Sequence, residues 1–463
     1  MANVIESKKS CTVNPLKMSQ PLGASYAYMG LNNCMPMMHG SQGCTGFGLV
    51  LLVRHFREAI PLQTTAMNEA TTILGGMDQI EQAVVNIKKR ANPDVIGICS
   101  TGLTETKGED VGGDLKIIRG KHPELGDTQV VYVSTPDYVG AFQDGWAKAV
   151  LAMIEALVDS KPVNVDKQIN VLPGCHLTAG DIEELREIIE AFGLGAVVLP
   201  DISGSLDGHI PDDFSPSTIG GTTLEEIRTM GSSVLTIAIG EQMRACAEGL
   251  QAATGVEFEL FDRLTGLEAN DRLLMTLSRI SGHPVPLKFR RQRSQLVDAM
   301  LDGHFFFGGK KIAIGAEPDL LWATGSWLAE MGCELTALVT TTKSPMLAKL
   351  PAEEVVIGDL EDLELRSKEC DLLITHSHGR QAAERLHIPF YRMGIPMFDR
   401  LGSAHQLSVG YRGTRRLIFE IGNMFLASGH ENHPGSWPLP AAETASNAAA
   451  EVVTQAVVEL VHS

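Results

Sequence analysis

Short, continuously apolar runs alternate with longer segments of helical spacing along this chain, and that alternation restricts the possible fold more than any other feature. The apolar runs fall at 95–99, 130–133, 169–173, 196–199, 234–239, 311–314, 334–339 and 371–374. Segments of helical spacing between them include 142–158, 178–189, 241–253 and 318–331. Apolar strands separated by amphipathic helices are typical of parallel sheets that helices cover on both faces. The sequence therefore predicts an α/β fold with mostly parallel sheets.

The length of the chain, 463 residues, exceeds what one hydrophobic core usually organises. We expect three Rossmann-like domains built from right-handed β/α units. They are predicted at 1–165, 166–300 and 301–435, with a C-terminal tail over 436–463. The boundaries are placed near 160–167 and within 284–309, where a basic helical stretch joins the last two domains. The region after about Gly429 is rich in Pro, Ala, Asn and Ser, and we expect it to pack on the surface or against a partner.

The charge pattern excludes several classes of partner. The net charge is −18, and the basic runs at 88–90 and 290–291 are too short to follow a nucleic-acid backbone. The longest apolar run near the N-terminus, at 49–53, is far too short to cross a bilayer, and no targeting segment is visible. No predicted strand is followed by a glycine-rich phosphate-binding motif. We therefore expect a cytoplasmic protein that does not bind nucleic acid, membrane or nucleotide.

The segment with the strongest chemical signal surrounds Cys44, in the sequence H-G-S-Q-G-C at 39–44. Cys44 follows two glycines in a predicted loop, at the point where the chain turns into an apolar helix. Glycines let backbone N–H groups approach a sulfur atom closely, and a helix N-terminus favours the thiolate. Both features suit an iron–sulfur ligand. From residue type alone, however, a small cysteine packed at a turn is the favoured interpretation.

A family resemblance changes that weighing. It is carried by N-P-L-K-M-S-Q-P-L-G at 14–23, H-G-S-Q-G-C at 39–44, and R-H-F-R-E at 54–58 followed by Pro61. These motifs resemble the β-type branch of the nitrogenase component 1 family. That branch contains the catalytic β subunits and a subunit of the cofactor-assembly scaffold. The scaffold type is favoured by I-P-L-Q-T-T-A-M at 60–67, T-G-L-T-E-T at 101–106 and D-I-S-G-S-L-D-G-H at 201–209, with weaker likeness at 298–302 and 358–363.

The departures from the family pattern define the predicted site. Catalytic β subunits of the family supply three cysteines to an eight-iron cluster, and the corresponding positions here are Ser19, Cys44 and Gly102. The resemblance therefore implies that Cys44 is the single thiolate that this chain gives to a [4Fe-4S] cluster at a subunit interface. The other three thiolates would come from the partner. Ser19, His39, Gly43 and Gly102 are expected in the surroundings of the cluster.

The resemblance implies a scaffold subunit rather than a stand-alone enzyme. On such a scaffold the precursor of the nitrogenase iron-molybdenum cofactor receives molybdenum and homocitrate before delivery to apo-nitrogenase. The chain would form an α2β2 heterotetramer with a NifE-type subunit, which would hold most of the precursor. The iron protein NifH would dock on the complex, and NifB would donate the precursor.

Three other functions stay open. A catalytic nitrogenase-type β subunit is opposed by the missing thiols at Ser19 and Gly102. A subunit of a tetrapyrrole-reducing oxidoreductase, with a related fold and an interfacial four-iron cluster, is disfavoured by the matches at 62–67 and 201–209. An apo structural paralogue would bind nothing.

The remaining cysteines favour structural roles. Cys34 lies near Cys44 in sequence, but packing is favoured over a place beside the cluster. Cys175 stands out because it follows a strand end, and such ends face crevices in α/β folds. Cys11 lies in the N-terminal arm and no role is expected for it. A core position is predicted for Cys99, Cys246, Cys333 and Cys370.

The histidines and one serine-rich loop are weaker candidates. His39 and His55 could orient the predicted cluster loop, but hydrogen-bonded structural roles are favoured. His376 and His378, two residues apart, would point to opposite sides of an extended chain, so no metal is expected there. The loop 203–207 is either a plain turn or the lining of a crevice.

Overall fold

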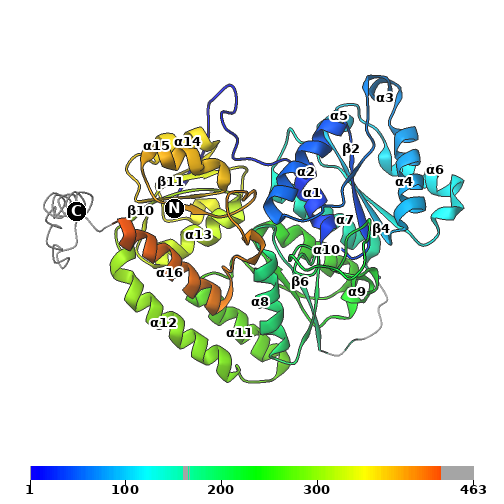
Figure 1. Cartoon of the computed structure of the whole chain (residues 1–463). Helices are drawn as coiled ribbons and strands as arrows, with labels where there is room; N and C mark the ends of the chain where they lie inside the picture. The colour runs from blue at the N-terminus through cyan, green and yellow to red at the C-terminus, as the bar shows by residue number, and fades with distance from the viewer. Residues whose placement is uncertain (1, 160–164, 166, 429–463) are drawn as a thin grey trace, which may run out of the picture.

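The computed structural model describes residues 2–159, 165 and 167–428, and it contains three parallel sheets (Figure 1). The predicted α/β fold with mostly parallel sheets is therefore confirmed. The predicted tail at 436–463 lies outside the described residues. The division of the chain into three domains stays a prediction.

The first sheet has the strand order β3-β2-β4-β5 and carries the predicted site at one edge. Its strands are β2 (Cys34–His39), β3 (Gln63–Thr64), β4 (Val95–Ser100) and β5 (Gln129–Val133). Six buried residues in β4 confirm the apolar run from which that strand was predicted. The helices of this part are α1 (Gln20–Met29), α2 (Gln42–Phe56), α3 (Glu69–Leu74), α4 (Met77–Ala91), α5 (Gly102–Glu105), α6 (Val111–Lys121) and α7 (Phe142–Leu157).

The second sheet has the order β7-β6-β8-β9. Its strands are β6 (Gln168–Leu172), β7 (Gly195–Val198), β8 (Thr236–Ile239) and β9 (Phe258–Phe261). Thr178 caps the next helix as predicted, because its hydroxyl accepts the Asp181 N–H at 3.0 Å. The helices are α8 (Ala179–Glu190), α9 (Leu224–Thr229), α10 (Arg244–Thr254) and α11 (Leu267–Ser281).

The third sheet has the order β1-β12-β11-β10-β13-β14, and its first strand comes from the beginning of the chain. The strands are β1 (Asn3–Glu6), β10 (Lys311–Ala316), β11 (Glu334–Thr340), β12 (Glu354–Ile357), β13 (Leu372–Thr375) and β14 (Phe390–Arg392). No long apolar run marks β1 in the sequence, because it is a short edge strand. Its helices are α12 (Leu287–Phe307), α13 (Pro318–Glu330), α14 (Leu360–Arg366), α15 (Arg380–Leu386) and α16 (Gly410–Ser428).

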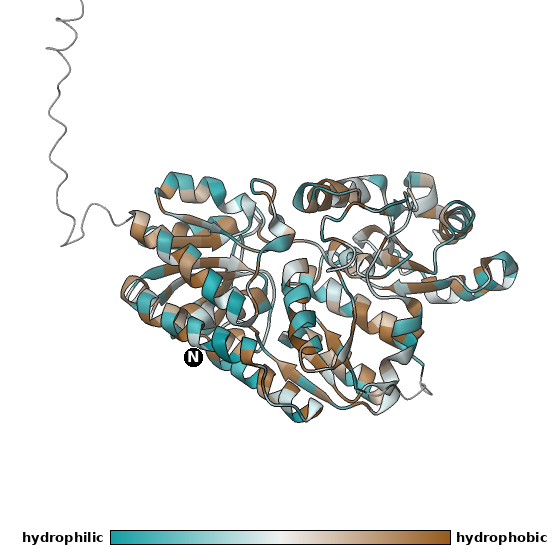
Figure 2. Cartoon of the chain, turned by 60° about the horizontal axis from the view of Figure 1, so that its bottom comes forward, coloured by the Kyte–Doolittle hydropathy of each residue, from teal (hydrophilic) through white to brown (hydrophobic). Residues whose placement is uncertain are grey.

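Hydrophobic residues follow the strands, and hydrophilic residues lie on the outer faces of the helices (Figure 2). Helix α1 is an exception, because all ten of its residues are buried. Its small residues allow a close approach to α7: a Cβ added at Gly23 would overlap the carbonyl group of Phe142. Trp146 of α7 is fully buried and donates its indole N–H to the Pro173 carbonyl at 3.0 Å, which ties the first sheet to the second.

Among the described residues, no helix has the length and apolar character needed to cross a membrane.

Candidate functional site

The predicted site residues lie at the carboxyl edge of the first sheet. Because its strands are parallel, the loops that follow β2, β4 and β5 emerge at the same edge. Ser19 is the N-cap residue of α1, Cys44 lies in the first turn of α2, and Gly102 begins α5. Three helix starts therefore meet the end of one sheet, an arrangement that is typical of ligand sites in α/β folds.

Short contacts hold these loops together. The Thr101 hydroxyl donates to the His39 carbonyl at 3.0 Å, which joins the β4 loop to the β2 loop. The Gln20 amide donates to the Pro136 carbonyl at 3.1 Å, which joins the start of α1 to the β5 loop. The carboxylate of Asp137, in that same loop, occupies the space where a Cβ on Gly102 would lie. Asp137 has no signal in the sequence that would have identified it.

Cys44 is exposed at the start of α2, which contradicts the packing interpretation based on residue type alone. Its sulfur lies 3.5 Å from the Ser41 hydroxyl. On the following turns of α2, Phe47 is 67% and Val50 52% exposed. Exposed apolar residues on successive helical turns are typical of a protein–protein interface.

The other cysteines differ sharply from Cys44. All eight lie in the described part of the chain, and besides Cys44 the exposed one is Cys11. Burial raises the pKa of the Cys99, Cys246 and Cys333 thiols to about 12. Cys34, Cys175 and Cys370 are also buried. The core positions predicted for Cys99, Cys246, Cys333 and Cys370 are therefore confirmed. Within the described residues, no group of three or more His, Cys, Asp or Glu side chains could hold a metal ion.

Two of the predicted neighbours of Cys44 have clear geometry. His39 is buried, with Nδ1 3.0 Å from the Thr65 hydroxyl and Nε2 2.9 Å from the Glu109 carboxylate. Burial lowers the pKa of the His39 imidazole. Gly43 is exposed, and apart from its chain neighbours and the backbone of its own helix, the nearest described atom to a Cβ added there is the Ser41 hydroxyl, 3.9 Å away.

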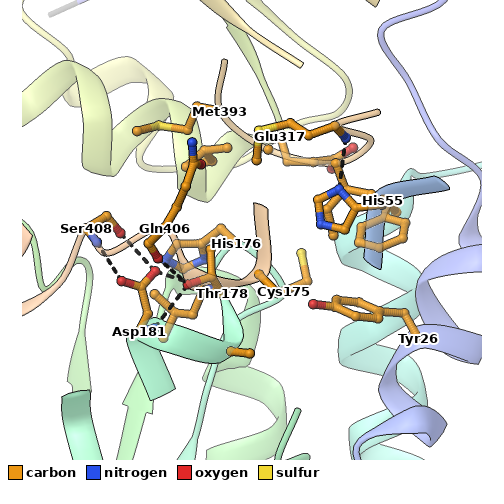
Figure 3. Close-up of a pocket in the computed structure, with 18 of the residues that line it drawn as sticks. Tyr26, His55, Cys175, His176, Thr178, Asp181, Glu317, Met393, Gln406 and Ser408 are labelled. Atoms are coloured by element: carbon orange, nitrogen blue, oxygen red, sulfur yellow. Dashed lines mark hydrogen bonds between the residues drawn. The ribbon is translucent and has the colours of Figure 1, made fainter. Parts of the chain in front are cut away.

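A small cavity of about 60 Å³ lies at the carboxyl end of β6 (Figure 3). Its polar lining includes Tyr26, His55, Cys175, His176 and Glu317, so Cys175 does face a crevice. Burial lowers the pKa of His176 to about 4 and raises the pKa of Glu317 to about 8. His176 and Glu317 were not predicted, because neither stands in a recognisable motif.

The remaining candidate residues make contacts that are typical of structural side chains. His376 is buried and its Nε2 lies 3.2 Å from the Leu16 carbonyl, while the rings of His376 and His378 are 5.1 Å apart. In the loop 203–207, the Ser203 N–H donates to the Asp201 carboxylate at 3.0 Å. Ser205 of this loop lines a surface groove beside Glu58.

Comparison with known proteins identifies the family. A family model described as "Nitrogenase component 1 type Oxidoreductase" matches residues 19–426. The chain belongs to the nitrogenase component 1 family.

Relatives within the component 1 family are similar over nearly their whole length. A protein of Bradyrhizobium diazoefficiens named "Nitrogenase iron-molybdenum cofactor biosynthesis protein NifN" is 59% identical over 445 residues, covering 94% of this chain and 95% of that protein. A protein of the same name from Rhodobacter capsulatus is 49% identical, covering 95% and 97%. The solved structure "Nitrogenase Cp1 at pH 6.5" superposes with a TM-score of 0.87 at 32% identity, covering 93% of this chain and 97% of that chain. The component 1 fold predicted from the sequence motifs is thereby confirmed.

Proposed function

We propose that this chain is the β-type subunit of an iron–sulfur scaffold on which the precursor of the nitrogenase iron-molybdenum cofactor is matured. On this scaffold molybdenum and homocitrate are inserted before the cofactor is delivered to apo-nitrogenase. The proposal is supported by the similarity to proteins named as cofactor biosynthesis proteins. The structural observation that carries it is the exposed Cys44 at the start of α2.

The donor set of the chain fits one corner of a [4Fe-4S] cluster. Such a cluster needs about four thiolates, and the neighbouring loops offer the hydroxyl of Ser19 and no side chain at Gly102. The exposed sulfur of Cys44 in the first turn of α2, next to Gly43, leaves room for a cluster beside it. The cluster, when bound, supplies electron transfer at the subunit interface. The other three thiolates come from a second chain.

The surface around Cys44 fits a protein partner. Phe47, Val50 and Val53 are exposed along α2, and Tyr138 and Val139 are exposed in the loop that contacts Gly102. Burying these side chains against a second chain would remove apolar surface from water, which favours association. The partner is a NifE-type subunit, which holds most of the precursor, in an α2β2 heterotetramer. NifH docks on this cytoplasmic complex, and NifB supplies the precursor.

A catalytic β subunit is the second candidate, and the surroundings of Gly102 oppose it. Position 102 carries no side chain, the Asp137 carboxylate occupies the space beside it, and position 19 carries a hydroxyl. A single exposed thiol is also compatible with an oxidoreductase that carries a four-iron cluster at its subunit interface. The relatives named above favour cofactor assembly instead.

The deciding experiment compares two exposed cysteines in the complex purified without oxygen. Cys44→Ala should remove about four iron atoms per αβ pair and abolish the paramagnetic signal of the reduced cluster. Cys11→Ala, the matched control, should leave both unchanged. Full iron content in Cys44→Ala would exclude Cys44 as the cluster ligand. Purification of the parent protein without a second chain would exclude the scaffold function.

A further inference from the structure

The motif R-H-F-R-E at 54–58 ends the helix that Cys44 begins, and its contacts are with a different part of the chain. His55 Nδ1 accepts the Met397 N–H at 2.8 Å (Figure 3), and the Ser403 hydroxyl donates to the His55 carbonyl at 2.6 Å. Both partners belong to the loop between β14 and α16. The C-terminal end of α2 is thus bound to the region of the third sheet.

Two arginines reinforce this attachment through one phenylalanine. The guanidinium carbon of Arg54 lies 4.3 Å from the centroid of the Phe398 ring, and the Arg57 guanidinium donates to the Phe398 carbonyl at 3.1 Å. Arg57 is the C-cap residue of α2, with a left-handed φ of 61°. Its own N–H donates to the Val53 carbonyl at 2.8 Å. We call these contacts of 54–57 with 397–403 the α2 lock.

The imidazole of His55 acts in the lock as a neutral acceptor. His55 is buried, and burial lowers its pKa to about 4. The ring therefore carries its proton on Nε2, which leaves Nδ1 free to accept the Met397 N–H. Leucine at this position would leave that buried N–H unpaired, whereas asparagine offers an acceptor oxygen.

At its other end, α2 begins after a loop that is fixed through hydrogen bonds of His39 and Gly40, but the first turn itself makes few side-chain contacts. Ser41 makes no side-chain cap hydrogen bond, and the Thr45 hydroxyl is buried without a partner among the described residues. Gly43 and Gly46 have no side chains, and no described heavy atom lies within 4 Å of a Cβ added at Gly46. The first turn of α2 is thus fixed by few side-chain contacts of its own, whereas Gly48 in the next turn packs against the core.

Cys44 and His55 lie in the first and last turns of one 15-residue helix. At about 1.5 Å per residue, roughly 16 Å separates them along the axis. An α-helix of this length transmits a rotation or shift of one end to the other. We infer that the α2 lock positions the Cys44 sulfur for the cluster, so that Arg54, His55 and Arg57 are positioning residues. This inference rests on the proposed function.

The test uses the complex purified without oxygen, with three variants of this chain. His55→Leu should keep the iron content but shift the midpoint potential and broaden the paramagnetic signal of the reduced cluster. Hydrogen exchange of the amides of residues 45–50 should become about tenfold faster. His55→Asn should restore the parent signal. Arg54→Leu, at an exposed position, should give a smaller shift in the same direction, and it serves as the test if His55→Leu does not fold.

A similar arginine–phenylalanine contact elsewhere in the chain provides a matched control. Arg272 lies 4.4 Å from the centroid of the Phe261 ring and donates to the Leu260 carbonyl at 3.0 Å. Arg272→Leu should leave the cluster signal unchanged. Parent-like signal and potential in both His55→Leu and Arg54→Leu would overturn the lock while leaving the proposed function intact. Full iron in Cys44→Ala would overturn the proposed function itself.

Discussion

The carboxylate of Asp137 fills the space into which a side chain at Gly102 would have to project. Gly102 begins α5 after β4, and Asp137 follows β5, so two neighbouring loops of one parallel sheet share this space. A missing side chain in one loop is therefore matched by a side chain from the next. Asp137 is exposed, so its carboxylate has to turn aside toward solvent if position 102 gains a side chain.

The first prediction follows from that packing. Gly102→Cys should lower the free energy of unfolding by about 1 kcal/mol or less, because the exposed Asp137 carboxylate can turn aside from the new side chain. Adding Asp137→Ala should recover most of this loss. Urea denaturation of the complex measures both, with Ser19→Cys as a control that adds a thiol at a half-exposed helix cap. Equal stability of Gly102→Cys and the parent would show that Asp137 turns aside at no cost.

Much of the fold could be predicted because it depends on local pattern. The apolar runs at 95–99 and 311–314 became β4 and β10, since buried parallel strands leave no polar alternation to obscure them. Strand β1 was missed because its four residues are exposed or half-exposed at a sheet edge and pair with β12, far along the chain. Such long-range pairing gives no signal in the local sequence.

The site could be predicted only in part, for a similar reason. The glycines and the helix start drew attention to Cys44, but only the family resemblance favoured a cluster ligand over a packed cysteine. Asp137, His176 and Glu317 were missed because their roles depend on loops that meet only in the folded chain. The lock partner of His55, the Met397 N–H, is separated from it by most of the sequence.

A second prediction concerns the exposed face of α2. Gly46→Leu should not destabilise the isolated chain, because a Cβ there meets no described atom within 4 Å and leucine favours a helix by about 1 kcal/mol over glycine. It should, however, reduce recovery of the αβ complex several-fold. Gly120→Leu on α6, where an added Cβ is equally unobstructed, is the control. Normal assembly of Gly46→Leu would place the interface elsewhere.

A third prediction concerns pH. Asp319 is fully buried, and burial raises its pKa from 3.8 to about 6. The folded state thus binds this proton more tightly than the unfolded state does, and protonation of Asp319 stabilises the fold. This contribution to the free energy of unfolding is complete below about pH 4 and is lost as pH rises through 6. The loss amounts to about 3 kcal/mol at most. Asp319→Asn should remove this component of the pH dependence, as measured by urea denaturation between pH 4 and 8. An unchanged slope would mean that Asp319 titrates normally.

The last prediction uses the two exposed cysteines as reporters of the interface. In the native isolated chain, a maleimide should label Cys11 and Cys44 rapidly, because the other six thiols are buried. In the αβ complex, labelling of Cys44 should fall at least tenfold, since its sulfur would be ligated and covered. Labelling of Cys11 reports whether the N-terminal arm stays accessible and shows that the reagent is active. Mass spectrometry of the digested protein measures each site separately. If Cys44 in the complex reacts as fast as in the free chain, its sulfur lies outside the interface and binds no cluster.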